Sequence, residues 1–251
     1  MRGSDRTKIG GSRSTFLATQ WSQINAFAGL NPDEQQAVLA DLMACYWKPV
    51  YCYLRRKGHG NEEAKDLTQG FFQEIVMGRH LVEQADEAKG RFRTLLLTAL
   101  DRYVISVHRQ QTAAKRRPAM KVSLPDDADD ALSIVARDMR PEEAFTHAWA
   151  CDLLREVLAE IQSRCMQDDK QIHWQLFCRR VVEPLLANQE APPLSQLCEE
   201  YGVPTAVKAE NMIVTVRKRF QTAMKDRVRQ YVASEDEVDQ EIRDLMVILS
   251  R

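Results

Sequence analysis

The chain has 251 residues, of which 44% are hydrophobic and 28% are charged, and its formal net charge is −1. This composition is typical of a soluble globular protein with one or two domains, and the lack of any apolar run of roughly 18 residues excludes a membrane-spanning helix. The near-zero net charge excludes the strongly basic class of free-standing nucleic-acid binders.

The N-terminal residues 1–14 are charged and rich in glycine and serine. They lack the apolar segment of a secretory signal, and we expect them to form a flexible arm. The six cysteines of the chain show no CxxC spacing, which argues against a zinc site. Most of them lie in apolar helical patterns, where a reduced cysteine behaves as a small hydrophobic residue. We therefore expect a cytoplasmic protein.

Hydrophobic spacing predicts helices along nearly the whole chain, and neither alternating apolar runs nor Asn-Gly turns indicate β-strands. The first helix is expected within 15–28. The second begins after Asn31, a capping residue followed by proline and two acids, and it ends at Gly58 after a basic segment. Asn61 is expected to cap a third helix, which ends near Gly78. The sequence thus predicts an all-α protein.

The segment DLTQGFFQEIV (66–76) belongs to the third helix. At about 100° per residue, one side of this helix carries only polar or small residues: Glu62, Asp66, Gln69, Gly70 and Gln73. Phe72 lies at the border of this polar side and is expected to be exposed. Solvated faces usually pair glutamate with lysine four residues apart, but this segment contains no lysine. We interpret the side as a docking surface, with a plain solvated face of a helix bundle as the alternative.

The segment 91–111 carries a dense apolar stripe and is predicted to be a helix. Arg102, Ser106 and Arg109, spaced i, i+4 and i+7, share a face away from that stripe. Basic residues continue past the helix: Lys115, Arg116 and Arg117. The helix and its continuation therefore form one basic surface.

The composition changes over 119–140, which holds an acidic run at 126–130. We interpret this segment as a linker that separates an N-terminal helical domain, 15–118, from a C-terminal helical domain, 141–232.

The sequence from 194 onward predicts a helix-turn-helix: a short helix over 194–201, a turn at Gly202 and a longer helix from about Thr205. The apolar side of the longer helix is expected to be buried: Ala209, Met212, Ile213, Val216, Phe220 and Met224. Its opposite arc carries groups that donate to phosphates and base edges: Lys208, Asn211, Thr215, Lys218, Arg219 and Thr222. An ordinary αα-hairpin with a glycine turn is the alternative.

The C-terminal extension, 233–251, is predicted to form an amphipathic helix, with Ser234 as its cap and acids in its first turns. Its apolar face must be covered, because each large apolar side chain left in water forfeits about 1.5–3 kcal/mol. Two interpretations stay open. The helix either closes the core of the C-terminal domain, or it folds back on the N-terminal domain and holds the chain in a compact, inactive state.

Three segments in this order resemble the extracytoplasmic-function sigma factors, bacterial initiation factors that direct RNA polymerase to promoters. WKPVYCYLRRKGHGNEEAKDLTQGFFQEIV (47–76) is similar to the family's core-polymerase-binding region, and GRFRTLLLTALDRYVISVHRQ (90–110) is similar to its helix for the minus-ten element. The segment 141–232 looks like its domain for the minus-thirty-five element. The resemblance implies two helical domains, core RNA polymerase and promoter DNA as partners, and regulation by an anti-sigma protein or by the extension.

The resemblance also implies roles for individual residues. Those expected to bind core polymerase are Asp66, Gln69, Phe72 and Gln73. Those expected to bind DNA are Arg102, Ser106, Arg109, Lys115, Arg116, Arg117, Lys208, Asn211, Thr215, Lys218 and Arg219. The family's linker passes near the polymerase's RNA path, which implies that the acidic run 126–130 acts there as an RNA mimic. A plain solubilising linker is the alternative. Gly70 departs from the family, which often has glutamate there, and costs about 1 kcal/mol of helix propensity.

The main alternative function is a stand-alone helix-turn-helix regulator that binds DNA without polymerase. Such a regulator needs a dimer interface, and no heptad seam indicates one. A helical scaffold protein is a further alternative. The five histidines lie apart in the sequence, and neither an HExxH motif nor a nucleophile elbow nor a glycine-rich phosphate loop is present. The sequence therefore predicts no enzyme, no metal site and no cofactor.

Overall fold

The structure, a computed structural model, describes residues 21–78, 81–86, 91–113, 139–187, 189–232 and 235–249. Every regular element within these ranges is helical and none is a strand, so the all-α prediction is confirmed. None of these helices combines the length and the apolar content that crossing a bilayer requires. Several parts of the sequence interpretation lie outside the described residues: the arm 1–14, Lys115, Arg116, Arg117, nearly all of the linker with its acidic run, and Ser234.

The described chain begins with α1 (Trp21–Ala26) and a 3-10 turn (Phe27–Gly29), followed by the long helix α2 (Pro32–Arg56). Asn31 caps α2 as predicted. Its side chain accepts a hydrogen bond of 3.0 Å from the amide of Glu34, whose carboxylate accepts one from the amide of Asn31. After α2 the chain turns at Gly58, whose φ of 97° is one that glycine adopts readily.

The next elements are α3 (Asn61–Phe71), a π-helical turn (Phe72–Met77) and α4 (Phe92–Ala113). Asn61 does not cap α3, contrary to the prediction. The capping position belongs to Gly60, without a side-chain hydrogen bond, and the side-chain oxygen Oδ1 of Asn61 instead accepts a 2.8 Å hydrogen bond from the hydroxyl of Tyr51. The side chain that the sequence assigned to the local cap thus joins α3 to α2.

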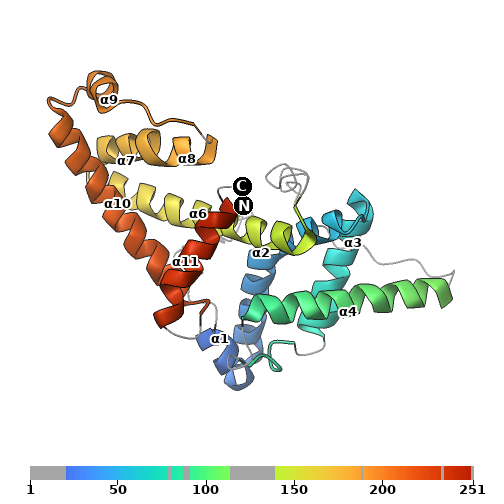
Figure 1. Cartoon of the computed structure of the whole chain (residues 1–251). Coiled ribbons are helices and arrows are strands. Elements are labelled where there is room, and N and C mark those ends of the chain that lie inside the picture. The colour runs from blue at the N-terminus through green and yellow to red at the C-terminus, as the bar shows by residue number, and fades with distance from the viewer. Residues whose placement is uncertain are drawn as a thin grey trace, which may run out of the picture.

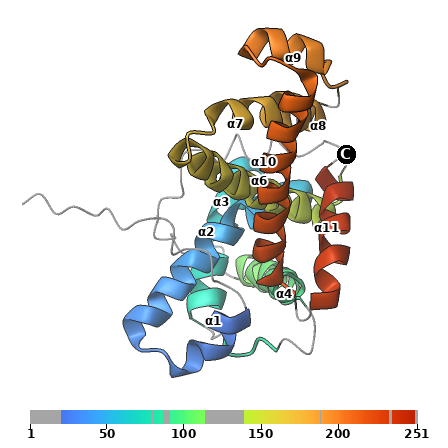
Figure 2. The same ribbon diagram turned by 90° about the vertical axis from the view of Figure 1, so that its left-hand side faces the viewer.

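The C-terminal half begins with α6 (Pro141–Gln167), followed by α7 (Gln171–Phe177), a π-helical turn (Cys178–Val182) and α8 (Glu183–Ala187). It continues with α9 (Leu194–Tyr201), the long α10 (Ala206–Arg229) and α11 (Glu235–Leu249). In Figures 1 and 2, α9 lies at one end of α10 and α11 runs beside the other end. The two helices expected around Gly202 are therefore present, with α9 over the expected residues.

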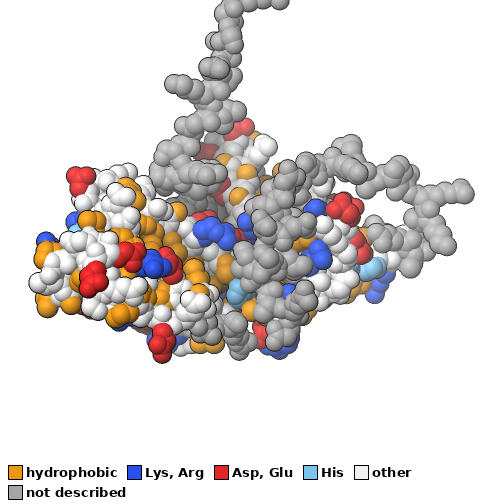
Figure 3. Space-filling model, turned by 90° about the horizontal axis from the view of Figure 1, so that it is seen from above, with side chains coloured by type: hydrophobic (Ala, Val, Ile, Leu, Met, Phe, Trp, Pro, Cys, Tyr) orange, Lys and Arg blue, Asp and Glu red, His pale blue; other side chains and the backbone are white. Residues whose placement is uncertain are grey.

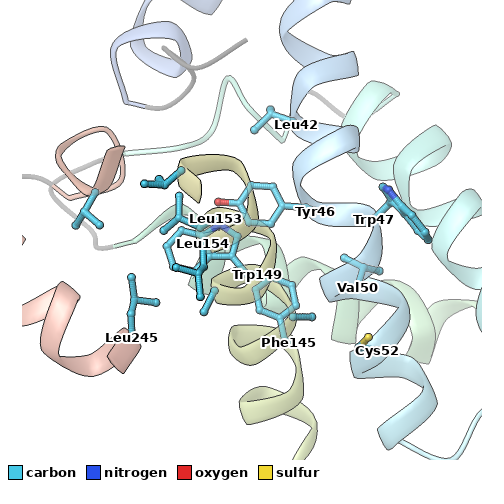
Figure 4. Packing of buried hydrophobic residues seen from close by; sticks show 14 of the residues in the cluster. Leu42, Tyr46, Trp47, Val50, Cys52, Phe145, Trp149, Leu153, Leu154 and Leu245 are labelled. Atoms are coloured by element: carbon cyan, nitrogen blue, oxygen red, sulfur yellow. The ribbon is translucent and has the colours of Figure 1, made fainter. Parts of the chain in front are cut away.

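The core is built mainly by α2 and α6, which pack along each other. Figure 4 shows Tyr46 of α2 facing Phe145 and Trp149 of α6, and the rings of Tyr46 and Phe145 are stacked with centroids 6.2 Å apart. Buried apolar residues of both halves form one continuous cluster. The two segments predicted as domains therefore share a core in this structure, while the boundary between them stays a prediction.

The apolar face of α11 is covered by α6 and α10. Val238 and Leu245 are buried, and Ile242 and Leu249 pack against the same core. Ion pairs at the rim join the acids of α11 to α10: Lys225 lies 2.9 Å from Asp239, and Arg229 lies 2.7 Å from Glu235. The prediction that this face must be covered is confirmed.

Candidate functional site

The turn between α9 and α10 is held in place by backbone and side-chain hydrogen bonds. Gly202 has a φ of 64°, and the amide of Val203 donates to the carbonyl of Cys198 over 2.9 Å. Thr205 caps α10, because its hydroxyl accepts from the amide of Lys208. Several inner side chains around this turn are buried: Leu197, Val203, Ala209, Ile213 and Val216. The packing therefore determines which side of the first turns of α10 is buried and which side is turned outward.

The outward arc of α10 is open at three of its predicted DNA-binding residues. Lys208, Asn211 and Lys218 are exposed. Thr215 is half-buried, and its hydroxyl donates to the carbonyl of Asn211 over 2.8 Å. Arg219, also half-buried, pairs with Asp168 at 2.8 Å and so already has a partner within the protein. The open part of the arc offers two ammonium groups and a carboxamide, which suit phosphates and base edges.

The face of α4 forms a second open surface. Arg102 and Arg109 are exposed and Ser106 is half-buried, at the predicted i, i+4 and i+7 spacing. Ile105, next to this face, is 52% exposed. In Figure 1 the C-terminal part of α4 extends away from the remaining helices. The face is thus accessible to a large ligand.

The polar side of α3 is open at Asp66 and Gln73, and Gln69 is half-buried beside them. The prediction that Phe72 is exposed is wrong, because its side chain is only 2% exposed. Phe72 is the first residue of a π-helical turn and belongs to the buried core cluster, so tertiary packing covers a side chain that helical spacing leaves at the border. Phe72 packs edge-on against Phe71, with ring centroids 5.5 Å apart.

Gly70 has a structural role that its position on the polar side does not indicate. A Cβ atom built on Gly70 would lie 2.2 Å from the hydroxyl oxygen of Tyr103 on α4. The glycine therefore allows α3 and α4 to approach, and Phe71 and Tyr103 pack with ring centroids 5.9 Å apart. Nothing in the local sequence pairs residue 70 with residue 103.

A buried ion pair that the sequence interpretation missed joins α11 to the N-terminal half. Glu241 is fully buried, forms a bidentate contact with Arg93, and lies 2.8 Å from Arg91. The guanidinium of Arg93 also lies 4.9 Å above the ring of Trp149. A signal was present in the sequence: Glu241 falls between Val238 and Leu245 on the apolar face of α11. A carboxylate on such a face requires an ionic partner.

All six cysteines are free thiols. Burial raises the pKa of Cys45, Cys52 and Cys178 to about 12, and that of Cys151 to about 11. These four thiols are therefore neutral at physiological pH and poor nucleophiles. Their environment agrees with the interpretation of these cysteines as small hydrophobic residues.

Charges of both signs are mixed on the face of the molecule seen in Figure 3, where acidic and basic side chains lie among hydrophobic ones on the described residues. The exposed donors predicted to bind DNA lie on α4 and α10, and other exposed basic side chains, such as Arg140 and Arg164, lie elsewhere. Comparisons of the chain with family models, curated proteins and solved structures gave no match.

Proposed function

We propose that the chain is a sigma factor that binds core RNA polymerase and directs it to promoters. The observation that carries this proposal is the pairing of α9 and α10: a rigid glycine turn buries the inner side of α10 and leaves Lys208, Asn211 and Lys218 exposed on its outer side. This arrangement supports the proposal of a helix-turn-helix whose second helix enters a DNA groove.

The second DNA-binding surface of the proposal is the face of α4, with Arg102, Ser106 and Arg109. Two basic faces on separate helices suit a protein that contacts two promoter elements. The low net charge of −1 suits it as well, because nonspecific DNA affinity grows with each phosphate that a protein neutralises. Such a factor depends on polymerase for tight DNA binding and does not occupy the genome alone.

The polar side of α3 distinguishes a sigma factor from a stand-alone regulator. Asp66 and Gln73 are exposed, so packing in the core does not account for these two residues. A carboxylate and carboxamides can pair with arginines on a partner helix with less desolvation than several charges would require. In the proposal, this side of α3 binds core polymerase.

The test is run-off transcription with purified core polymerase, with and without the full chain, on a library of promoter fragments. Specific transcripts that require the chain are expected, together with co-purification of the chain and core polymerase. A stable dimer that binds palindromic DNA and leaves core polymerase inactive would instead favour the stand-alone regulator.

A further inference from the structure

The fold brings His108 beside His59 and Glu63, two potential metal ligands that lie four residues apart, although the sequence predicted no metal site. His59 lies in the turn after α2, Glu63 in the first turn of α3, and His108 in the last part of α4. One ligand atom of each residue lies within 4.8 Å of the others. The Nδ1 atom of His59 is 3.1 Å from a carboxylate oxygen of Glu63, and the two imidazole rings are stacked with centroids 5.8 Å apart.

We propose that His59, Glu63 and His108 form a binding site for a divalent transition metal ion, with Zn²⁺ as the ion that fits best. Two imidazoles and one carboxylate match the ligands of three-residue zinc sites, in which a water molecule takes the fourth position. A donor set with only one carboxylate disfavours Mg²⁺ and Ca²⁺, which prefer several oxygen ligands. The thiols are not needed, so the absence of CxxC spacing does not argue against this site.

The distances suit a tetrahedral ion after a small adjustment. Bonds of about 2.0–2.2 Å place the ligand atoms of tetrahedral Zn²⁺ about 3.4 Å apart. The His59–Glu63 distance is already close to this value, and every distance in the group is at most 4.8 Å. His108 is exposed and can rotate toward the other two, whereas the side chain of His59 is held with only 11% of its area exposed.

Basic residues close to the site along the chain are partly neutralised by acidic partners. Two of the basic residues close to these ligands along the chain already have acidic partners: Lys57 pairs with Asp101 at 2.6 Å, and Lys65 pairs with Glu62 at 3.4 Å. Arg109 directly follows His108 and is exposed. The carboxylate of Glu63 remains the local negative charge at the three ligands. An ordinary solvated pair of His59 and Glu63, four residues apart, explains two members of the group but not the convergence of His108 from another helix.

A bound ion would connect the turn after α2 and the start of α3 to α4. Polar links between the end of α2 and α4 already exist seven residues earlier, at Asp101, which accepts a 2.8 Å hydrogen bond from the hydroxyl of Tyr53 and pairs with Lys57. The ion would hold the later part of α4, next to Ser106 and Arg109. Metal binding at this site does not depend on the proposed sigma-factor function, so it can be tested separately.

The test is calorimetric titration of the EDTA-treated full chain with Zn²⁺, for the wild type and for His59→Gln, Glu63→Gln and His108→Gln. The control is His173→Gln, which removes a half-buried histidine on α7. One site per chain is expected, with at least tenfold weaker affinity in each ligand variant and wild-type affinity in the control. Circular dichroism verifies that the variants are folded, and His108, being exposed, is the safest of the three to replace.

A second measurement identifies the ligands directly. Co²⁺ bound at the site is expected to give visible bands without the strong near-ultraviolet absorption of a cobalt–thiolate bond. The midpoint of thermal unfolding is expected to rise with Zn²⁺ in the wild type and not in His108→Gln. No binding, binding through thiolates, or unchanged affinity in the His59→Gln/His108→Gln double variant would overturn the proposal.

Discussion

Gly70 on α3 lies directly against the side chain of Tyr103 on α4. A Cβ atom at position 70 would lie 2.2 Å from the hydroxyl oxygen of Tyr103 and 3.3 Å from its Cζ atom. Tyr103 is 7% exposed, so its ring has little room to move away. Helix propensity alone favours alanine over glycine by about 1 kcal/mol. The steric effect has the opposite sign and is expected to dominate.

We therefore predict that Gly70→Ala lowers the free energy of unfolding by about 1–3 kcal/mol, as overpacking of a core does. The measurement is urea unfolding followed by circular dichroism. In the background of Tyr103→Phe, which removes the hydroxyl, the cost of Gly70→Ala is expected to fall by at least about 1 kcal/mol. Equal costs in the two backgrounds would show that the hydroxyl is not the obstacle.

At the scale of single helices, the open faces of α10, α4 and α3 are the parts that the proposed function uses. Each face is exposed because the opposite side of its helix is buried: Ile213 and Val216 on α10, Leu96 and Leu100 on α4, and Leu67 and Phe71 on α3. Substitutions on an open face should therefore alter binding without altering the fold. The three faces can be tested one at a time.

For α10 we predict that Lys218→Glu weakens closed-complex formation on linear promoter DNA and lowers the slope of log affinity against log salt by at least about 1. Arg102→Glu on α4 is expected to slow a step closer to promoter melting. Arg243→Glu is the matched control, because this exposed residue of α11 lies outside both faces. Identical footprints and kinetics for Lys218→Glu and Arg102→Glu would contradict the assignment of the two faces to two elements.

For α3 we predict that Asp66→Ala weakens binding to core polymerase by about 1.5–3 kcal/mol, the usual value of a hydrogen bond to a charged group. Glu74→Ala, on the adjoining π-helical turn, removes one exposed carboxylate that is not among the proposed polymerase-binding residues and serves as the control. Binding is measured by fluorescence anisotropy of the labelled chain. The docking proposal is lost if both variants bind as the wild type does, and a loss of helical signal would assign Asp66 a structural role.

At the scale of the whole molecule, α11 ties the two halves of the chain together. Its apolar face packs on α6 and α10, while Glu241 reaches Arg91 and Arg93 at the start of α4. The structure therefore contains elements of both interpretations of the extension: it closes the core of the C-terminal half, and it contacts the N-terminal half. An activity measurement on a chain without α11 tests whether the contact with the N-terminal half inhibits the protein.

Glu241→Gln keeps the size of the side chain but leaves Arg93, whose side chain is 13% exposed, without its counter-ion. Breaking a buried pair in this way costs about 3–5 kcal/mol. We predict a loss of about 3 kcal/mol in urea unfolding, since Arg91 is exposed enough to be solvated. Asp236→Asn, an exposed acid on the first turn of α11, should cost less than about 1 kcal/mol. Similar small losses in both variants would argue against the ion pair.

Deletion of the chain after Val232 removes the cover from α6 and α10. We predict that it lowers the free energy of unfolding by at least about 3 kcal/mol, because Val238 and Leu245 each contribute about 1.5 kcal/mol or more by burial. Run-off activity per folded molecule is expected to stay unchanged or to fall. Activity above that of the full chain would show that α11 holds the protein in an inactive state.

The sequence by itself determined the elements of this protein. The cap at Asn31 and the turn residues Gly58 and Gly202 lie where the residues predicted, and α10 begins directly after Thr205, close to its predicted start. The buried and exposed sides of α10 agree with its spacing, although Met212 and Phe220 are only half-buried. These features depend on interactions within a few residues of one another, which a linear pattern records.

Only the tertiary structure decided which distant side chains meet. It buried Phe72 in the core, placed Tyr103 against Gly70, paired Glu241 with Arg93, and brought His108 to His59. Each of these contacts depends on how α3, α4 and α11 are oriented and shifted relative to the core of α2 and α6. Helical spacing specifies which face of a helix is apolar, but it contains no information about the residue that packing places opposite that face.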